Sequence, residues 1–427
     1  MADTLTRRRF LQTSLGAVGL AQCVSWDAAR LFAEETTPLK PREKLPVAAV
    51  VTEYRKGSHA DVIVGKILEG WSQDGGPGPD LELVSLFVDQ VGDGDLSASL
   101  SKKHGFRVTK TIREGLTLGT DSLAVAGVLS IGEHGHYPSV LETQQVMYPR
   151  RRFFDEIVAT FRECHKVVPV FNDKHLSYAW GDARHMYDAA RELRVPFMAG
   201  SSVPVAWRKP SVTIPLGSEI TEAIALGHGG LEAYGFHSLE GLQCLMERRK
   251  GGETGVKAVQ TVTGDGIWQA EKAGRWSRAL FDAVVEATPT PYNGQRPRPL
   301  QIAQDAVFYL IEYRDGSKGT VAMNTGFAHE FACAVSVRGM NEPLALTYVL
   351  EEAPPFRHFE HLLRAIEQMI HSGKPPYPVE RTLLTTGILD AALHSLADKH
   401  RRLDTPQLAI AYEPVDWPFA KGLPSPS

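Results

Sequence analysis

The sequence predicts an α/β protein in two parts: a doubly wound parallel sheet, then an α+β domain whose sheet is open and mainly antiparallel. Short apolar runs alternate with amphipathic helices from residue 47 to residue 202, a pattern typical of βαβ units. Later apolar runs flank Asp315-Gly316, which is a turn signal for a β-hairpin. The chain has 427 residues, enough for two domains. The first part is therefore expected to be Rossmann-like.

The composition excludes some classes of partner. Hydrophobic residues make up 43% and charged residues 22% of the chain, which are ordinary values for a globular protein. The formal net charge of −4 provides no basic excess to replace the counterions of phosphate groups. We therefore expect no nucleic-acid partner.

The N-terminal residues are typical of an export signal. Thr6-Arg7-Arg8-Arg9-Phe10-Leu11-Gln12 precedes a mildly apolar stretch, residues 11–24, that is too short to span a bilayer stably. This pattern resembles the bacterial Tat signal, which implies a periplasmic or otherwise exported protein. We expect residues 1–33 to be a signal peptide and 34–45 a linker, with no stable membrane span once the signal is removed.

Each element of the first part follows from a local pattern. The β-branched run 47–51 predicts a buried strand. Ser58, followed three residues later by Asp61, predicts a helix start, and apolar residues continue at helical spacing to Trp71. The other strands predicted in this part are 81–88, 122–131, 167–171 and 196–202, and the other helices are 95–104, 151–165 and 182–194.

The second part does not repeat the βαβ pattern of the first. Residues 306–313 and 319–324 form the predicted hairpin, and 256–263 is expected to join the same sheet. Two amphipathic helices, 359–371 and 383–396, close the chain. The predicted boundaries are 46–180 for the Rossmann-like domain, 181–357 for the α+β substrate and oligomerisation domain, 358–403 for the closing helices and 404–427 for a tail.

The loop after the first strand lies where doubly wound sheets bind dinucleotides. In the Gly-x-Gly-x-x-Gly fingerprint, glycines let the backbone touch the pyrophosphate at a helix N-terminus. Here Thr52 and Tyr54 hold two of the glycine places and only Gly57 remains, so we expect the Tyr54 side chain to obstruct that approach. Arg55 could attract phosphate, and Asp89 ends the second strand, where a carboxylate would accept from ribose hydroxyls.

Three further clusters carry side chains suited to chemistry. The first is Glu133, His134 and His136, which follow a predicted strand and could bind a divalent metal or transfer protons. The second is Asp173-Lys174-His175, directly after another strand, where a lysine could polarise a carbonyl. The third is His237 and Glu240, which stand one helical turn apart, with the histidine suited to act as a general base. The alternative interpretations are a polar loop for the first cluster, a surface Asp/Lys pair for the second and a structural histidine for the third.

In this order, these pieces resemble the Gfo/Idh/MocA family, which includes glucose–fructose oxidoreductase and inositol dehydrogenase. The similarity covers roughly residues 44–403. Asp173-Lys174-His175 stands where the family carries Glu-Lys-Pro, so the resemblance implies that Lys174 contacts substrate and nicotinamide. Residues 235–240 resemble the family's Asp-x-Gly-x-x-x-His region, which would make His237 the catalytic base.

The resemblance implies hydride transfer at a sugar or polyol carbon, with NAD or NADP as cofactor and a homo-oligomer as the assembly. Lys174, His237 and Asp173 would be catalytic, and His175 and Glu240 would contact the substrate. Two alternatives stay open. One is a metal-dependent carbohydrate lyase or hydrolase that uses Glu133, His134 and His136. The other is a sugar-binding protein without catalytic activity on the same fold.

Overall fold

The structure is a computed structural model that describes residues 43–288, 302, 304–422 and 424. The predicted signal peptide, 1–33, and most of the predicted linker lie outside the described residues. Within the described residues, no helix has the length and apolar character needed to cross a membrane.

Six strands form the parallel sheet that the sequence predicts. In spatial order they are β3 (Arg107–Thr109), β2 (Leu81–Val88), β1 (Leu45–Val51), β4 (Gly127–Ile131), β5 (Val170–Asp173) and β6 (Phe197–Gly200). All neighbouring pairs are parallel. The order reverses between β1 and β4, and such a switch point is where doubly wound sheets bind ligands.

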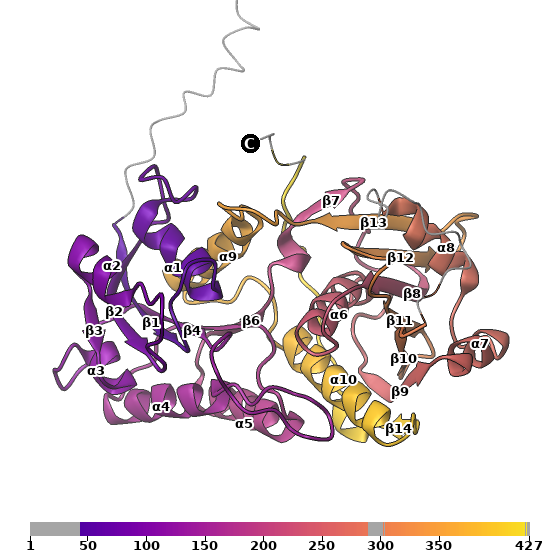
Figure 1. The fold of residues 1–427 in the computed structure, drawn as a ribbon, viewed down its shortest axis with the longest axis horizontal. Coiled ribbons are helices and arrows are strands. Elements are labelled where there is room, and N and C mark those ends of the chain that lie inside the picture. Colours follow the sequence, from indigo (N-terminus) through magenta and orange to yellow (C-terminus); the bar gives the residue numbers. More distant parts are fainter. Residues whose placement is uncertain (1–42, 289–301, 303, 423, 425–427) are drawn as a thin grey trace, which may run out of the picture. The chain divides into compact units, whose positions relative to one another are not determined.

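Helices cover both faces of this sheet (Figure 1). Alternate residues of β1 point to opposite sides, because strand side chains have a period of two. Val47, Ala49 and Val51 pack with α1 (His59–Glu69) and α9 (His358–Ser372). Ala48 and Val50 pack on the other side with α3 (Ile112–Thr117), α4 (Arg150–Glu163) and α5 (Trp180–Leu193), and α2 (Ser97–His104) lies at the β2–β3 edge. The first closing helix thus belongs to the first sheet.

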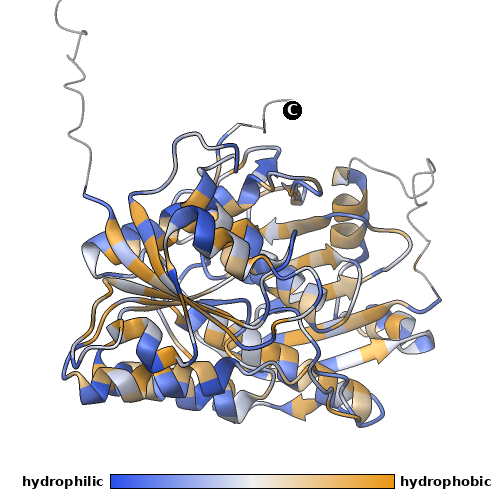
Figure 2. Cartoon of the chain, turned by 60° about the vertical axis from the view of Figure 1, so that its left-hand side comes forward, coloured by the Kyte–Doolittle hydropathy of each residue, from blue (hydrophilic) through white to orange (hydrophobic). Residues whose placement is uncertain are grey.

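The second sheet has eight strands and is mixed but mostly antiparallel. Its order is β14 (Leu403–Asp404), β9 (Val256–Thr263), β10 (Val307–Tyr313), β11 (Lys318–Met323), β8 (Ile220–Gly227), β12 (Phe331–Val337), β13 (Leu344–Val349) and β7 (Trp207–Lys209). Only β11 and β8 pair in parallel. The helices α6 (Ala233–Met246) and α10 (Glu380–Ala397) cover one face, and α7 (Asp265–Lys272) and α8 (Arg278–Ala287) pack on the other. Figure 2 shows apolar residues concentrated on the strands of both sheets.

Most predicted elements are confirmed. The hairpin pairs Val307 with Met323 and Glu312 with Lys318, and Gly316 turns it with φ +88°. The predicted strand 122–131 is too long, because β4 begins only at Gly127, although Leu123 and Val125 are buried ahead of it. The short elements β3 and α3 were not predicted. The predicted boundary at residue 180 stays a prediction, since the parallel sheet itself continues to Gly200.

Candidate active site

A cavity of about 750 Å³ lies between the carboxyl ends of the parallel strands and the second sheet. Elements from both sheets line it. The first part contributes residues from the start of α1 and from the loops after β4 and β5. The second part contributes α6, the start of β12 and the segment from β13 to α9. The lining includes His59, Glu133, His134, Lys174, His228, Tyr234, His237, His329, Phe331, Glu351, His358 and Phe359.

Lys174 and His237 meet in this cavity, as the resemblance implies. Lys174 Nζ lies 2.6 Å from His237 Nε2. Lys174 directly follows β5 and has φ +68°, and its amide donates to the Gly200 carbonyl at 3.1 Å, which fixes its direction. Burial, together with the nearby positive charge of Lys174, holds the pKa of His237 well below its usual value. His237 is therefore neutral at physiological pH, and its Nε2 accepts a hydrogen bond from the Lys174 ammonium group.

Glu133 supports this pair from the loop after β4. Its carboxylate lies 3.7 Å from Lys174 Nζ and 2.6 Å from Nη2 of Arg150, which is fully buried. Burial alone would raise the pKa of Glu133, but Lys174 and Arg150 outweigh it and hold that pKa well below the usual value. The Thr52 hydroxyl donates to the Glu133 carbonyl at 2.6 Å and anchors the loop to the end of β1. Glu133 is thus a fixed anion that balances the Lys174 charge.

A second polar pair faces the same cavity from α1. His59, the first residue of α1, donates from Nδ1 to Asp173 Oδ2 at 2.6 Å. Asp173 is 1% exposed and ends β5, next to Lys174. Asp173 was predicted to be catalytic, but its carboxylate is buried against His59 and instead positions that imidazole.

The predicted metal site does not form. Glu133 is bound to Arg150, and His136 is exposed, while the His136 backbone pairs in both directions with the Gln90 side chain. His134 does line the cavity, and burial and the neighbouring His59 lower its pKa to about 4. Across the described residues there is no group of three His, Cys, Asp or Glu side chains arranged to hold a metal ion. The described residues therefore give no support to Glu133, His134 and His136 as metal ligands.

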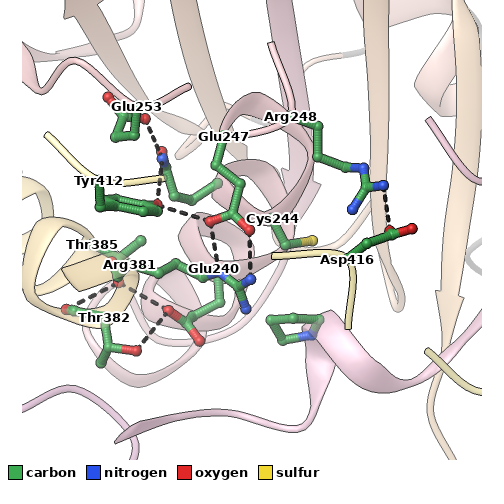
Figure 3. Close-up of polar contacts among 12 residues, drawn as sticks. Glu240, Cys244, Glu247, Arg248, Glu253, Arg381, Thr382, Thr385, Tyr412 and Asp416 are labelled. Carbon is green, nitrogen blue, oxygen red and sulfur yellow. Dashed lines mark hydrogen bonds and ion pairs between the residues drawn. The ribbon is translucent and has the colours of Figure 1, made fainter. Parts of the chain in front are cut away.

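The two predicted substrate residues lie outside the cavity lining. His175 is buried beneath it, with Nε2 3.0 Å from Arg150 Nη1 and 3.4 Å from Glu232 Oε1. Glu240 points toward α10, where it accepts from the Thr385 hydroxyl at 3.0 Å (Figure 3). It also accepts from the Ser201 amide at 3.2 Å. The contacts of both residues join parts of the protein to one another, so neither residue is placed to bind substrate.

Gly57 and Asp89, both predicted to bind a dinucleotide, are bound to other residues of the protein. The Gly57 amide, just before the start of α1, already donates to Asp61 Oδ2 at 2.8 Å. Asp89 accepts from the Tyr137 hydroxyl at 2.7 Å and is also paired with Arg152.

The other residues of this loop do not face the cavity. Tyr54 does not obstruct the crevice as predicted, because its ring is fully buried in the core with α1 and α9. Arg55 pairs with Glu53 at 2.6 Å. Thr52 is buried on the Glu133 loop. Of the five predicted cofactor residues only Gly57 lines the cavity, so this set does not fit a dinucleotide bound in the usual way.

Sequence reasoning missed several residues of the cavity. His59 lies between Ser58 and Asp61 of the predicted helix start but was not singled out, and His228, His329, His358 and Phe331 were not considered. One local signal could have found His228, because it directly follows the buried strand β8. His358 starts α9, where burial, His59 and Lys66 lower its pKa to about 3.

Comparison with known proteins identifies the fold. No family model matches the sequence, and no curated protein matches it. The structure of GenD2 from gentamicin A biosynthesis, solved in complex with NAD, is similar with a TM-score of 0.53 and 17% identity, covering 85% of this chain and 97% of that one. A myo-inositol dehydrogenase from Corynebacterium glutamicum has a TM-score of 0.52 and 13% identity, covering 84% and 98%. A scyllo-inositol dehydrogenase from Lactobacillus casei has a TM-score of 0.51 and 11% identity, covering 85% and 98%.

The chain therefore has the fold of the inositol dehydrogenases and related Gfo/Idh/MocA-type oxidoreductases, at low sequence identity. The fold predicted from the resemblance is confirmed.

Proposed function

We propose that the protein is an exported enzyme that acts on a hydroxyl group of a sugar or polyol. The observation that carries this proposal is the 2.6 Å contact between Lys174 Nζ and His237 Nε2 inside the cavity. When the Lys174 ammonium group turns from His237 Nε2 to the oxygen of a substrate hydroxyl, that nitrogen is free to take the hydroxyl proton. The Lys174 ammonium group then stabilises the negative charge that develops on the oxygen.

The cavity suits a carbohydrate. The aromatic rings of Tyr234 and Phe331 lie nearly parallel, with their centroids 6.1 Å apart, and offer an apolar wall. Histidine and glutamate side chains on the other walls supply donors and acceptors for several hydroxyls. A few placed polar groups in an otherwise apolar cleft are typical of small-molecule sites.

Two reaction classes follow from this acid–base pair. The fold favours oxidation or reduction of the hydroxyl carbon with NAD or NADP, which is the class predicted from the sequence. The engaged side chains Asp61, Asp89 and Asp173 favour a second class, proton transfer without a dinucleotide. Because the loop residues do not fit a dinucleotide, we derive no step through one.

Substitution of the pair tests the proposed function. We expect His237→Gln and Lys174→Gln to lower turnover about 100-fold or more, since a positioned acid–base group contributes roughly 10²–10⁴. Turnover is measured by NMR detection of products from a panel of sugars and polyols that includes myo-inositol and D-glucose. The matched controls are His104→Gln and Lys103→Gln, a surface histidine and lysine that share Glu69 at 2.7 Å and 2.6 Å. Full turnover in a folded His237→Gln variant would contradict the proposal, and binding without turnover in the wild type would favour a sugar-binding protein.

Export rests on Arg7-Arg8 and the following apolar stretch. We expect a fusion of residues 1–33 to a folded reporter protein to reach the periplasm of a Tat-competent bacterium. Replacing Arg7 and Arg8 with lysine should leave the reporter in the cytoplasm. Equal export of both fusions would rule out this route.

A further inference from the structure

The His59–Asp173 hydrogen bond spans the switch point of the parallel sheet. His59 starts the helix that follows β1, and Asp173 ends β5, while β4 lies between β1 and β5 in the sheet. A bond of 2.6 Å between these residues therefore passes over the carboxyl end of β4. In doubly wound sheets this crevice holds the dinucleotide.

Two more contacts engage polar groups that follow β1 and β2. The Asp61 carboxylate holds the Gly57 amide, and Asp89 holds Tyr137 and Arg152. Asp61 and Asp173 are both buried, and each carboxylate accepts a hydrogen bond from another part of the protein. The polar groups at this edge of the sheet are thus already bound to one another.

The same pair presents a proton-transfer group to the cavity. Because the Asp173 carboxylate only accepts, His59 must carry a proton on Nδ1, and in the neutral imidazole Nε2 is then the nitrogen with the lone pair. The His59 side chain is 14% exposed and lines the cavity with Lys174 and His237. Within the described residues, His59 Nε2 makes no hydrogen bond of its own. An imidazole oriented through its other nitrogen by a carboxylate is the arrangement of a general base.

We propose that the His59–Asp173 pair takes the place of the dinucleotide in this fold. It spans the switch point and supplies a second acid–base group, so one substrate is held between His59, from α1, and the Lys174–His237 pair. His59 is then a catalytic residue and Asp173 a positioning residue. This inference rests on the proposed function, since it needs the substrate to lie against Lys174 and His237.

The first experiment titrates the mature wild-type protein with NAD⁺ and with NADP⁺ by calorimetry, and analyses the protein by native mass spectrometry. We expect no binding heat up to millimolar nucleotide and no nucleotide mass on the protein. Micromolar affinity for either nucleotide, or a nucleotide that copurifies, would overturn the inference. His237→Gln would still lose turnover in that case, so the proposed function would stand.

The second experiment reads the His59 ring directly, by long-range ¹H–¹⁵N NMR of histidine-labelled wild-type protein at pH 8. We expect His59 to be protonated on Nδ1 and unprotonated on Nε2, with the signal assigned through its loss in His59→Gln. Asp173→Asn should shift the His59 nitrogens and leave His185 unchanged, since His185 pairs with Asp155 on the surface at 2.9 Å. A His59 ring protonated on Nε2 alone in the wild type would overturn its assignment as a second base.

Discussion

Glu240 is a buried carboxyl whose protonation should set part of the pH dependence of stability. Burial raises its pKa to about 7, and the nearby Arg381 only partly offsets this. Because the folded-state pKa lies above the usual 4.5, the folded protein binds the proton more tightly, and stability is lost as pH rises from 4.5 through 7. A shift of this size corresponds to roughly 3 kcal/mol.

We therefore expect Glu240→Gln to flatten the change in unfolding free energy between pH 5 and pH 8, as measured by urea denaturation. The wild type should lose about 2–3 kcal/mol more than the variant over this interval. The control is Glu163→Gln, which removes an exposed carboxylate paired with Arg113. Parallel pH profiles for Glu240→Gln and the wild type would show that Glu240 is ionised throughout.

Single residues differ in how far the sequence could predict their roles. Lys174 follows a strand and His237 lies on a helix, and both were predicted to act on the same substrate. The structure places the two side chains in contact. His237 and Glu240 are one turn apart, but α6 is buried on nearly every side, so helical spacing could not tell which neighbour each residue meets. His59 and Asp173 are 114 positions apart, and only the order of the strands brings them together.

The first turn of α1 carries His59, a residue that lines the candidate active site. The Ser58 hydroxyl caps α1 by accepting from the Asp61 amide at 3.3 Å, and the next residue is His59. Ser58→Ala should cost about 1 kcal/mol of unfolding free energy and loosen the first turn, which carries His59. The matched control is Ser277→Ala, which removes the equivalent cap of α8, where Ser277 Oγ accepts from the Leu280 amide at 3.3 Å. We expect similar losses in urea denaturation, with the His59 nitrogen signals broadened only in Ser58→Ala. Unchanged His59 signals in Ser58→Ala would show that Asp173 alone positions the ring.

Elements with strong local signals were predicted well. The strands Leu81–Val88 and Val256–Thr263 match the predicted ranges, because each combines apolar residues with clear turn signals at its ends. The start of β4 was misplaced, since Leu123 and Val125 are buried without pairing in the sheet and so look like strand residues. The edge strand Arg107–Thr109 has three residues, of which only Thr109 is buried, so periodicity could not reveal it.

At the scale of the whole molecule, the chain packs one helix on each sheet after β13 and then adds the edge strand β14 to the second sheet. The helix α9 packs on the parallel sheet with α1, and α10 packs on the second sheet with α6. Packing between residues far apart in the chain produces no local sequence pattern. The two helices were therefore predicted without the sheet that each one covers. The predicted homo-oligomer stays a prediction that light scattering of the mature protein tests. The helices α7 and α8 already cover part of the sheet face that would be available for such contacts.

Tyr412 connects the C-terminal tail to α6 and, through Glu247, to α10. Its hydroxyl donates to Glu247 Oε2 at 2.8 Å and accepts from Gln243 Nε2 at 3.1 Å, while Glu247 also holds Arg381 of α10 at 2.8 Å (Figure 3). One hydroxyl thus joins the tail, α6 and α10.

Tyr412→Phe should lower the unfolding free energy by about 1.5–3 kcal/mol, because a hydrogen bond to a buried charged group is lost without a change in shape. The control is Tyr187→Phe, whose half-buried hydroxyl donates to Glu380 at 2.7 Å on the surface of α5. We expect that variant to lose less than about 1 kcal/mol, since water can replace the missing hydroxyl there. Equal losses in urea denaturation would mean that the Tyr412 hydrogen bond contributes no more to stability than a surface contact does.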